Sequence, residues 1–81
     1  MRSAETQAAA IAAMLTAATG GEPRLDETPD RIRVETDLPE HPSLVTRTAV
    51  LAALARAARF GHNRTADGDV VWAELDREAE Q

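Results

Sequence analysis

Side chains able to carry out catalysis are scarce in this sequence of 81 residues. It contains two serines, two histidines and no cysteine, tyrosine or lysine. A helix separates the histidines, His41 and His62, in the expected fold, so they lack the spacing of metal ligands. Asp67-Gly68-Asp69 resembles the start of a calcium-binding loop, but no helix is expected after it. We therefore expect no catalytic residue, no metal site and no cofactor.

Charge is the one uneven feature that could support binding. All nine cations are arginines, and with 14 acidic residues they give a net charge of −5. Residues 41–66 contain four of the arginines and no acid. Arg56 and Arg59 are expected on the outer side of a helix, and Arg64 on the strand that follows. His62 lies beside them and can contact a partner.

Two stretches have the periodicity of amphipathic helices. Residues 3–19 repeat apolar positions every three or four residues, with Ser3 as the N-cap. Gly20 and Gly21 are expected to end that helix. A second helix is expected to begin after Ser43, with one apolar arc directed at the core. This arc contains Leu44, Val50, Leu51, Leu54, Ala57 and Ala58.

Three stretches have the periodicity of strands, at residues 31–38, 60–65 and 69–75. The Asp67-Gly68 pair between the last two predicts a hairpin. Because residues 69–75 are the most apolar, we expect them to lie between the other two strands. The predicted sheet is therefore three-stranded and mixed, with order 1-3-2.

The element order α, β, α, β, β predicts a single two-layer α/β (α+β) domain over residues 1–81, in an order like that of winged-helix proteins. Both helices are expected to cover one face of the sheet. Residues 22–30, rich in acids and proline, are expected to form a solvated acidic connection. The charged tail, residues 76–81, is expected to fray.

Trp72 is the only tryptophan, and strand alternation allows its side chain to point to either face of the sheet. If Val71 and Leu75 face the helices, then Val70 and Trp72 form an apolar patch on the open sheet face, a common interface signature. In the other orientation Trp72 fills a core that is otherwise rich in alanine. Both alternatives remain open from the sequence.

Two classes of function are consistent with these features. The first is a small, non-enzymatic acidic module that binds a protein partner, or a copy of itself as a homodimer, through Val70, Trp72 and the arginine side of the second helix. The alternative is a winged-helix-like DNA-binding protein that uses Arg56, Arg59 and Arg64. The net charge of −5 and the acidic hairpin tip oppose DNA binding, so we favour the first. These arginines can also pair with the acids of the chain itself.

Two segments, RFGHNRTADGDVVWAEL (59–75) and VETDLP (34–39), resemble small uncharacterised actinobacterial proteins associated with mobile elements. The resemblance implies no function and no site residue. The sequence lacks cysteine and has no apolar run of the ~18 residues that a membrane-spanning helix needs. We therefore expect a cytoplasmic protein that does not contact membranes.

Overall fold

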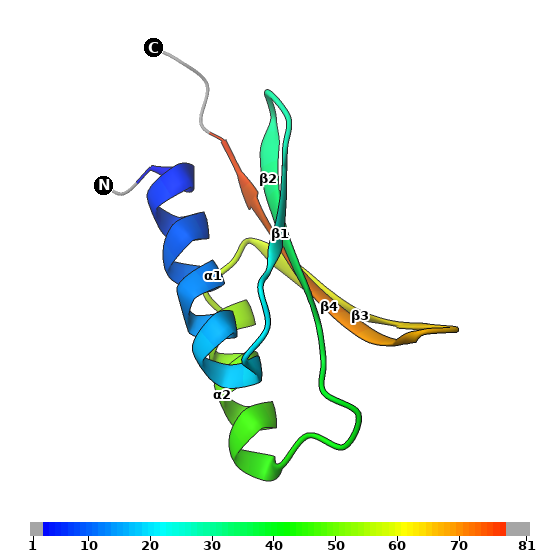
Figure 1. The fold of residues 1–81 in the computed structure, drawn as a ribbon. Helices are drawn as coiled ribbons and strands as arrows, with labels where there is room; N and C mark the ends of the chain where they lie inside the picture. The colour runs from blue at the N-terminus through cyan, green and yellow to red at the C-terminus, as the bar shows by residue number, and fades with distance from the viewer. Residues whose placement is uncertain (1–2, 78–81) are drawn as a thin grey trace.

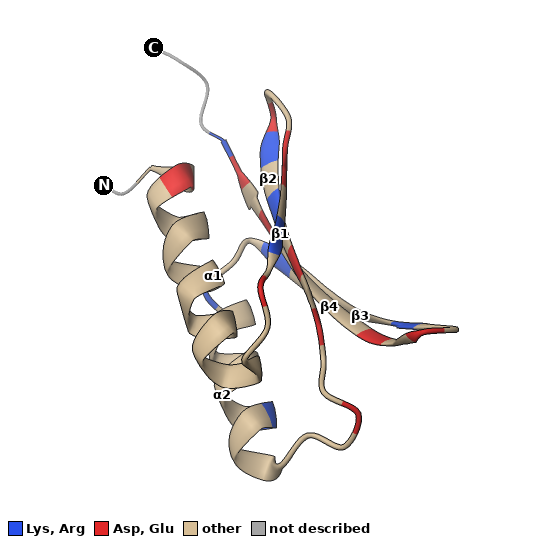
Figure 2. Ribbon diagram, viewed as in Figure 1, with Lys and Arg blue, Asp and Glu red and all other residues tan. Residues whose placement is uncertain are grey.

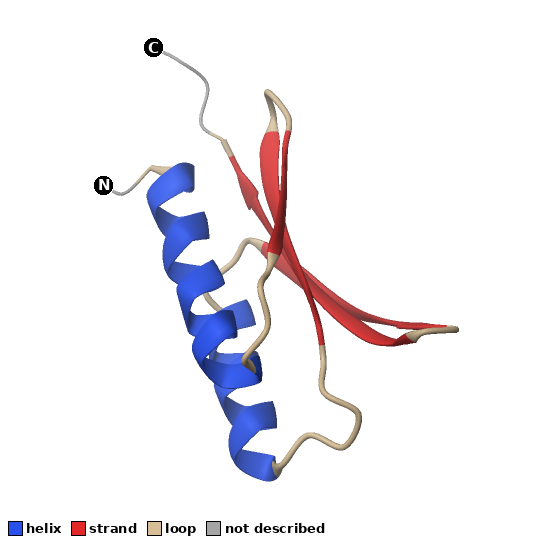
Figure 3. Cartoon of the chain, viewed as in Figure 1, coloured by secondary structure: helices blue, strands red, loops and turns tan. Residues whose placement is uncertain are grey.

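The structure, a computed structural model, describes residues 3–77 and contains two helices and one four-stranded antiparallel sheet (Figure 1). The α+β class is therefore confirmed. Both helices lie on the same side of the sheet, as the colouring by element type makes clear (Figure 3). The sheet order is β1-β2-β4-β3. The elements are α1 (Ala4–Thr19), β1 (Arg24–Glu27), β2 (Arg31–Asp37), α2 (Leu44–Leu54), β3 (Arg59–Thr65) and β4 (Gly68–Asp76).

The strand β1 corrects the expectation that residues 22–30 form only a solvated connection. Arg24–Glu27 pairs antiparallel with β2, with Leu25 opposite Val34. All four residues of β1 are exposed, so their side chains carry no alternation of buried and exposed positions that could mark a strand. Main-chain pairing with the edge of β2 holds this segment in the sheet instead.

The three expected strands are all present, and β4 lies between β2 and β3 as the apolar sequence predicted. The prediction of a mixed sheet was wrong. β4 is antiparallel to both of its neighbours, so no two adjacent strands run parallel. With β1 included, the order becomes α, β, β, α, β, β, which also differs from the expected winged-helix-like order.

Both serine N-caps are confirmed. The Ser3 hydroxyl accepts a hydrogen bond from the Thr6 amide, and the Ser43 hydroxyl accepts one from the Thr46 amide, each at 3.1 Å. Gly20 ends α1 in the left-handed conformation with φ of 78°, a conformation that favours glycine.

Replacing Ser43 by alanine should lower the free energy of unfolding by about 1 kcal/mol, because an amide of the first turn then loses its acceptor. The measurement is urea denaturation followed by circular dichroism. Ser43→Asp is the matched control, since aspartate also caps helices and its charge suits the positive end of the helix dipole. Equal losses in the two variants would contradict the capping role.

The core lies between α1 and the two central strands. α1 buries Ala8, Ile11 and Leu15, as its periodicity predicted, and packs against β2 and β4. α2 packs chiefly against α1, and the β3–β4 hairpin projects beyond both helices (Figure 1). The buried apolar residues are Ala8, Ile11, Leu15, Ile32, Val34, Val50, Ala53, Leu54, Val71, Ala73 and Leu75.

The predicted tail, residues 76–81, is only partly described. Asp76 ends β4, and Arg77 forms ion pairs with Glu5 of α1 and Glu27 of β1. These two residues are therefore held against the fold. Residues 78–81 lie outside the described part of the chain.

Candidate interaction surfaces

The outer face of α2 exposes large apolar side chains. The exposed fractions are 78% for Leu44, 79% for Val45 and 57% for Leu51. We expected Leu44 and Leu51 to face the core, and this was wrong. The buried residues of α2 are Val50, Ala53 and Leu54, which lie on the side of the helix away from Leu44.

Charged residues are almost absent from the two helices. α1 carries only Glu5 and α2 only Arg47, whereas the strands are densely charged (Figure 2). A surface helix normally has charged and polar residues opposite its buried face. The side of α2 that faces solvent in this structure is therefore unusually apolar.

An open groove separates α2 from the β3–β4 hairpin and has a volume of about 400 Å³. Leu51 lies on the helix side of the groove, and Phe60, which is 46% exposed, lies on the strand side. Phe60 faces the groove because it sits opposite Ala73, whose side of the sheet is buried under the helices. The remaining apolar lining consists of Leu38, Pro42, Val50, Leu54 and Val71.

The groove continues past the start of α2 to the hairpin tip, where its lining becomes polar. Arg64 pairs with Asp69 at 3.2 Å, and His62 Nε2 lies 3.7 Å from the same carboxylate. Among residues 3–77, Arg47 forms no ion pair. The charged residues at this end are Glu40, Arg47, Arg64, Asp67 and Asp69. This mixture of signs leaves the end of the groove near neutrality.

The three arginines predicted to act together do not share a surface. Arg56 lies in the turn after α2 rather than on the helix, because α2 ends at Leu54. Arg59 is the first residue of β3 and stands opposite Glu74 on the open face of the sheet. Arg64 stands opposite Asp69 on the helix side. The expected arginine face of the second helix was therefore wrong.

Trp72 lies on the open face of the sheet, because its neighbours Val71 and Ala73 are buried on the helix side. The Arg33 guanidinium carbon lies over the indole, 4.5 Å from the ring centroid. A Cβ atom on Gly61, the residue opposite Trp72 on β3, would lie 2.5 Å from the ring. The indole is thus packed between Gly61 and Arg33 and is partly buried. It is neither in the core nor a free patch.

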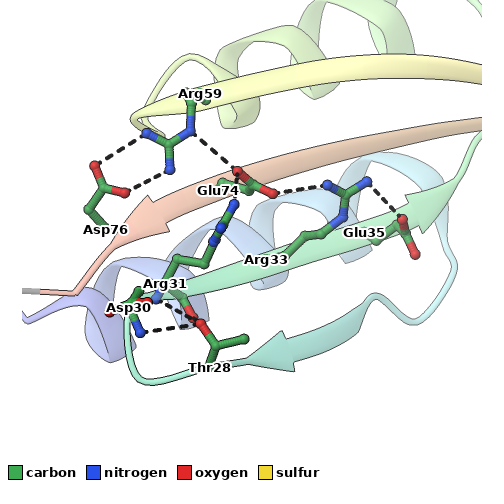
Figure 4. A network of polar contacts seen from close by, with 8 residues as sticks. All are labelled: Thr28, Asp30, Arg31, Arg33, Glu35, Arg59, Glu74 and Asp76. Atoms are coloured by element: carbon green, nitrogen blue, oxygen red, sulfur yellow. Dashed lines mark hydrogen bonds and ion pairs between the residues drawn. The ribbon is translucent and has the colours of Figure 1, made fainter.

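Glu74 is the centre of an ion-pair network on the open face (Figure 4). Its carboxylate accepts hydrogen bonds from Arg33 at 3.0 Å, from Arg59 at 3.3 Å and from Arg31 at 3.5 Å. The side chain is only 9% exposed. Arg59 also forms a bidentate pair with Asp76, in which its two terminal nitrogens donate to the two carboxylate oxygens at 2.7 and 3.3 Å.

Burial raises the pKa of Glu74, but the hydrogen bonds from Arg33 and Arg59 and the charge of Arg31 outweigh it, so its pKa lies below the usual value. The hydrogen bond from Arg59 likewise lowers the pKa of Asp76. The arginines of the open face are therefore largely neutralised by acids of the same face. A phosphate would have to displace these acids to bind there.

Metal-ligand clusters are absent from residues 3–77, where no group of three or more histidine, cysteine or carboxylate side chains could hold an ion. Within the same residues, no helix is both long and apolar enough to cross a membrane. Comparison with family models, curated proteins and solved structures found no match. The resemblance to actinobacterial proteins therefore stays a prediction.

Leu51 and Phe60, like Leu44 and Val45, are interaction candidates that the sequence analysis did not identify. Leu51 adjoins the buried Val50 and Leu54 on α2, so its periodicity matches that of a core residue. Phe60 is the second residue of β3, an edge strand against which neither helix packs closely, and sequence periodicity does not reveal that a strand lacks such cover. The predicted His62 and Arg64 do reach this groove, whereas Val70 and Trp72 lie on the opposite face.

Proposed function

We propose that this protein is a small, non-enzymatic binding module that acts through protein–protein contact. Its docking surface is the outer face of α2 together with the groove between α2 and the β3–β4 hairpin. The observation that carries the proposal is the exposure of Leu44, Val45 and Leu51, at 78%, 79% and 57%, on a helix with a single charge. A partner surface that covers these side chains removes apolar area from water, which is the main source of free energy in protein association.

This docking surface differs from the one that the sequence favoured, which contained Val70 and Trp72. Val70 and Trp72 lie among the ion pairs of the open face, where Arg33 already covers the indole. Truncating Trp72 would therefore disturb internal packing as well as any contact. Leu51 and Phe60 combine greater exposure with a concave site, which is where the anchor residues of interfaces concentrate.

The alternative function, binding of duplex DNA, has less support. Arg59 pairs with Glu74 and Asp76, and Arg64 with Asp69, so two of the three candidate arginines are internally neutralised. Binding to DNA phosphates relies on protein cations that are free to displace the counterions condensed on the DNA. A sub-micromolar, Arg56-dependent complex with duplex DNA at physiological salt would nevertheless overturn the protein-partner proposal.

The docking surface can be tested by site-specific photocross-linking in the native cell. A benzoylphenylalanine placed at Leu51 should give a discrete cross-linked protein product, and Val45→Glu in the same chain should reduce it by about tenfold or more. The same cross-linker at Leu25 is the matched control, because Leu25 is 47% exposed but lies on the far edge strand. No product from position 51, or equal products from both positions, would contradict the proposal.

A further inference from the structure

We infer that the partner at this surface is a second copy of the same chain, which pairs edge to edge along β3. The two copies would form one continuous eight-stranded sheet with a two-fold axis perpendicular to it. This inference rests on the proposed function, since it names the occupant of the same surface.

The two edges of the sheet differ in their capacity to accept another strand. β1 has four residues, three of them charged, and is bracketed by Pro23 and Pro29. Short, charged edges near proline resist pairing with other chains. β3 has seven residues and no proline, and all but Gly61 are exposed. An edge strand of this length leaves a row of main-chain donors and acceptors without strand partners. The open edge is therefore β3.

Pairing of β3 with its own copy places the apolar groups of both copies together. A two-fold axis perpendicular to the sheet makes the two β3 strands antiparallel and keeps the helices of both copies on one side. Phe60 and Leu51 already face that side within each copy. The groove of each copy would thus open towards the groove of the other. The Phe60 rings and the α2 helices of the two copies would then shield both grooves from solvent.

The charges of the groove favour this partner over a highly charged one. Its polar end mixes Glu40, Asp67 and Asp69 with Arg47 and Arg64, so neither an acidic peptide nor a polyanion finds a field of one sign. The β3 edge of a second copy is similarly balanced, because Arg59 and Arg64 are paired with acids of β4. Two such edges can approach without uncompensated repulsion.

The size of the chain adds a further reason for a second copy. At 8.7 kDa the protein has a small core, and three of the eleven buried apolar residues found between residues 3 and 77 are alanines. Chains of this length have marginal cores, so association that buries more apolar surface stabilises them appreciably.

Sedimentation velocity of the purified full chain, between about 1 µM and 1 mM, tests the inference. We expect the wild type to reach twice the 8.7 kDa mass of the monomer. Phe60→Glu should weaken the dimer about 100-fold, because it places a charge in the joined groove. Leu25→Glu should leave the dimer unchanged, although Leu25 and Phe60 are almost equally exposed at 47% and 46%. Leu51→Glu provides a second test on α2 if circular dichroism shows that Phe60→Glu does not fold.

Hydrogen exchange identifies the surface independently of mass. Alternate amides of β3 should exchange about tenfold more slowly in the dimer than in the monomer, whereas those of β1 should not change. A dimer without this protection, or one that survives Phe60→Glu and Leu51→Glu, would overturn the inference. A wild type that stays monomeric would overturn it too. In that case, a cross-link from position 51 to another protein would still support the proposed function. The lack of any cross-link would contradict both the proposed function and the homodimer.

Discussion

The Glu74→Gln variant should unfold with a free energy about 2 kcal/mol lower than that of the wild type. The carboxylate of Glu74 accepts hydrogen bonds from three arginines while only 9% of its side chain is exposed. Glutamine keeps the shape but loses the charge, and its amide hydrogens then face guanidinium donors. Urea denaturation at neutral pH, followed by circular dichroism, measures the difference.

The loss in Glu74→Gln should depend on pH in a defined direction. Arginine contacts keep the pKa of Glu74 in the folded protein below its usual value. The stabilisation is therefore complete above the unfolded-state pKa of about 4.3 and is lost as the pH falls through the folded-state pKa. Denaturation curves of the wild type and the variant should converge in acid. A difference that stays constant from neutral pH to acid would contradict the ionic origin of the stabilisation.

Glu35 provides the matched control on the same face. It also pairs with Arg33, at 3.3 Å, but its side chain is 31% exposed. Exposed ion pairs contribute less than about 1 kcal/mol, so Glu35→Gln should have a small effect at any pH. Similar losses at the two positions would mean that burial of Glu74 is not the cause.

Gly61→Ala should lower the free energy of unfolding by about 1–2 kcal/mol, even though alanine is normally preferred over glycine inside a strand. The added Cβ would lie 2.5 Å from Cζ2 and 2.6 Å from Cε2 of Trp72, so the indole must move. Because Trp72 is the only tryptophan, its fluorescence should report this movement as a shift to longer wavelength. Thermal or urea unfolding gives the change in stability.

Two further variants separate this clash from a general effect of replacing glycine. At Gly21 a Cβ would meet only Thr19 Oγ1 at 3.6 Å and Thr36 Oγ1 at 3.9 Å, so Gly21→Ala should cost little. In a Trp72→Leu background, Gly61→Ala should become nearly neutral, since the ring that it meets is gone. An unchanged cost in that background would exclude the contact with Trp72 as the cause.

Periodicity within single elements was enough to predict most of the secondary structure. The helix over residues 3–19, its Ser3 cap, the cap at Ser43 and three of the four strands all follow from local patterns. β1 was missed because both of its faces are exposed, so only main-chain pairing with β2 marks it as a strand. Main-chain hydrogen bonds between paired strands do not depend on a pattern of side chains, so the periodicity of this segment did not reveal them.

The candidate site depended more strongly on tertiary structure. The sequence by itself determined that the chain has few catalytic groups and that Val71 and Trp72 face opposite sides of their strand. The low charge of α2 followed only from the structure, in which the helix ends at Leu54, before Arg56 and Arg59. Only the packing decided which apolar side of α2 is buried, because Val50 and Leu51 differ in burial through the position of α1 and not through their own chemistry. The ion-pair partners of Arg59 and Arg64 were likewise decided by the cross-strand register, which places each arginine beside an acid of β4. The same register puts the two arginines on opposite faces of the sheet. The β3–β4 register depends on the hairpin turn that forms between Thr65 and Gly68, and helix cover depends on segments far apart in the sequence, so neither follows from the periodicity of a single element.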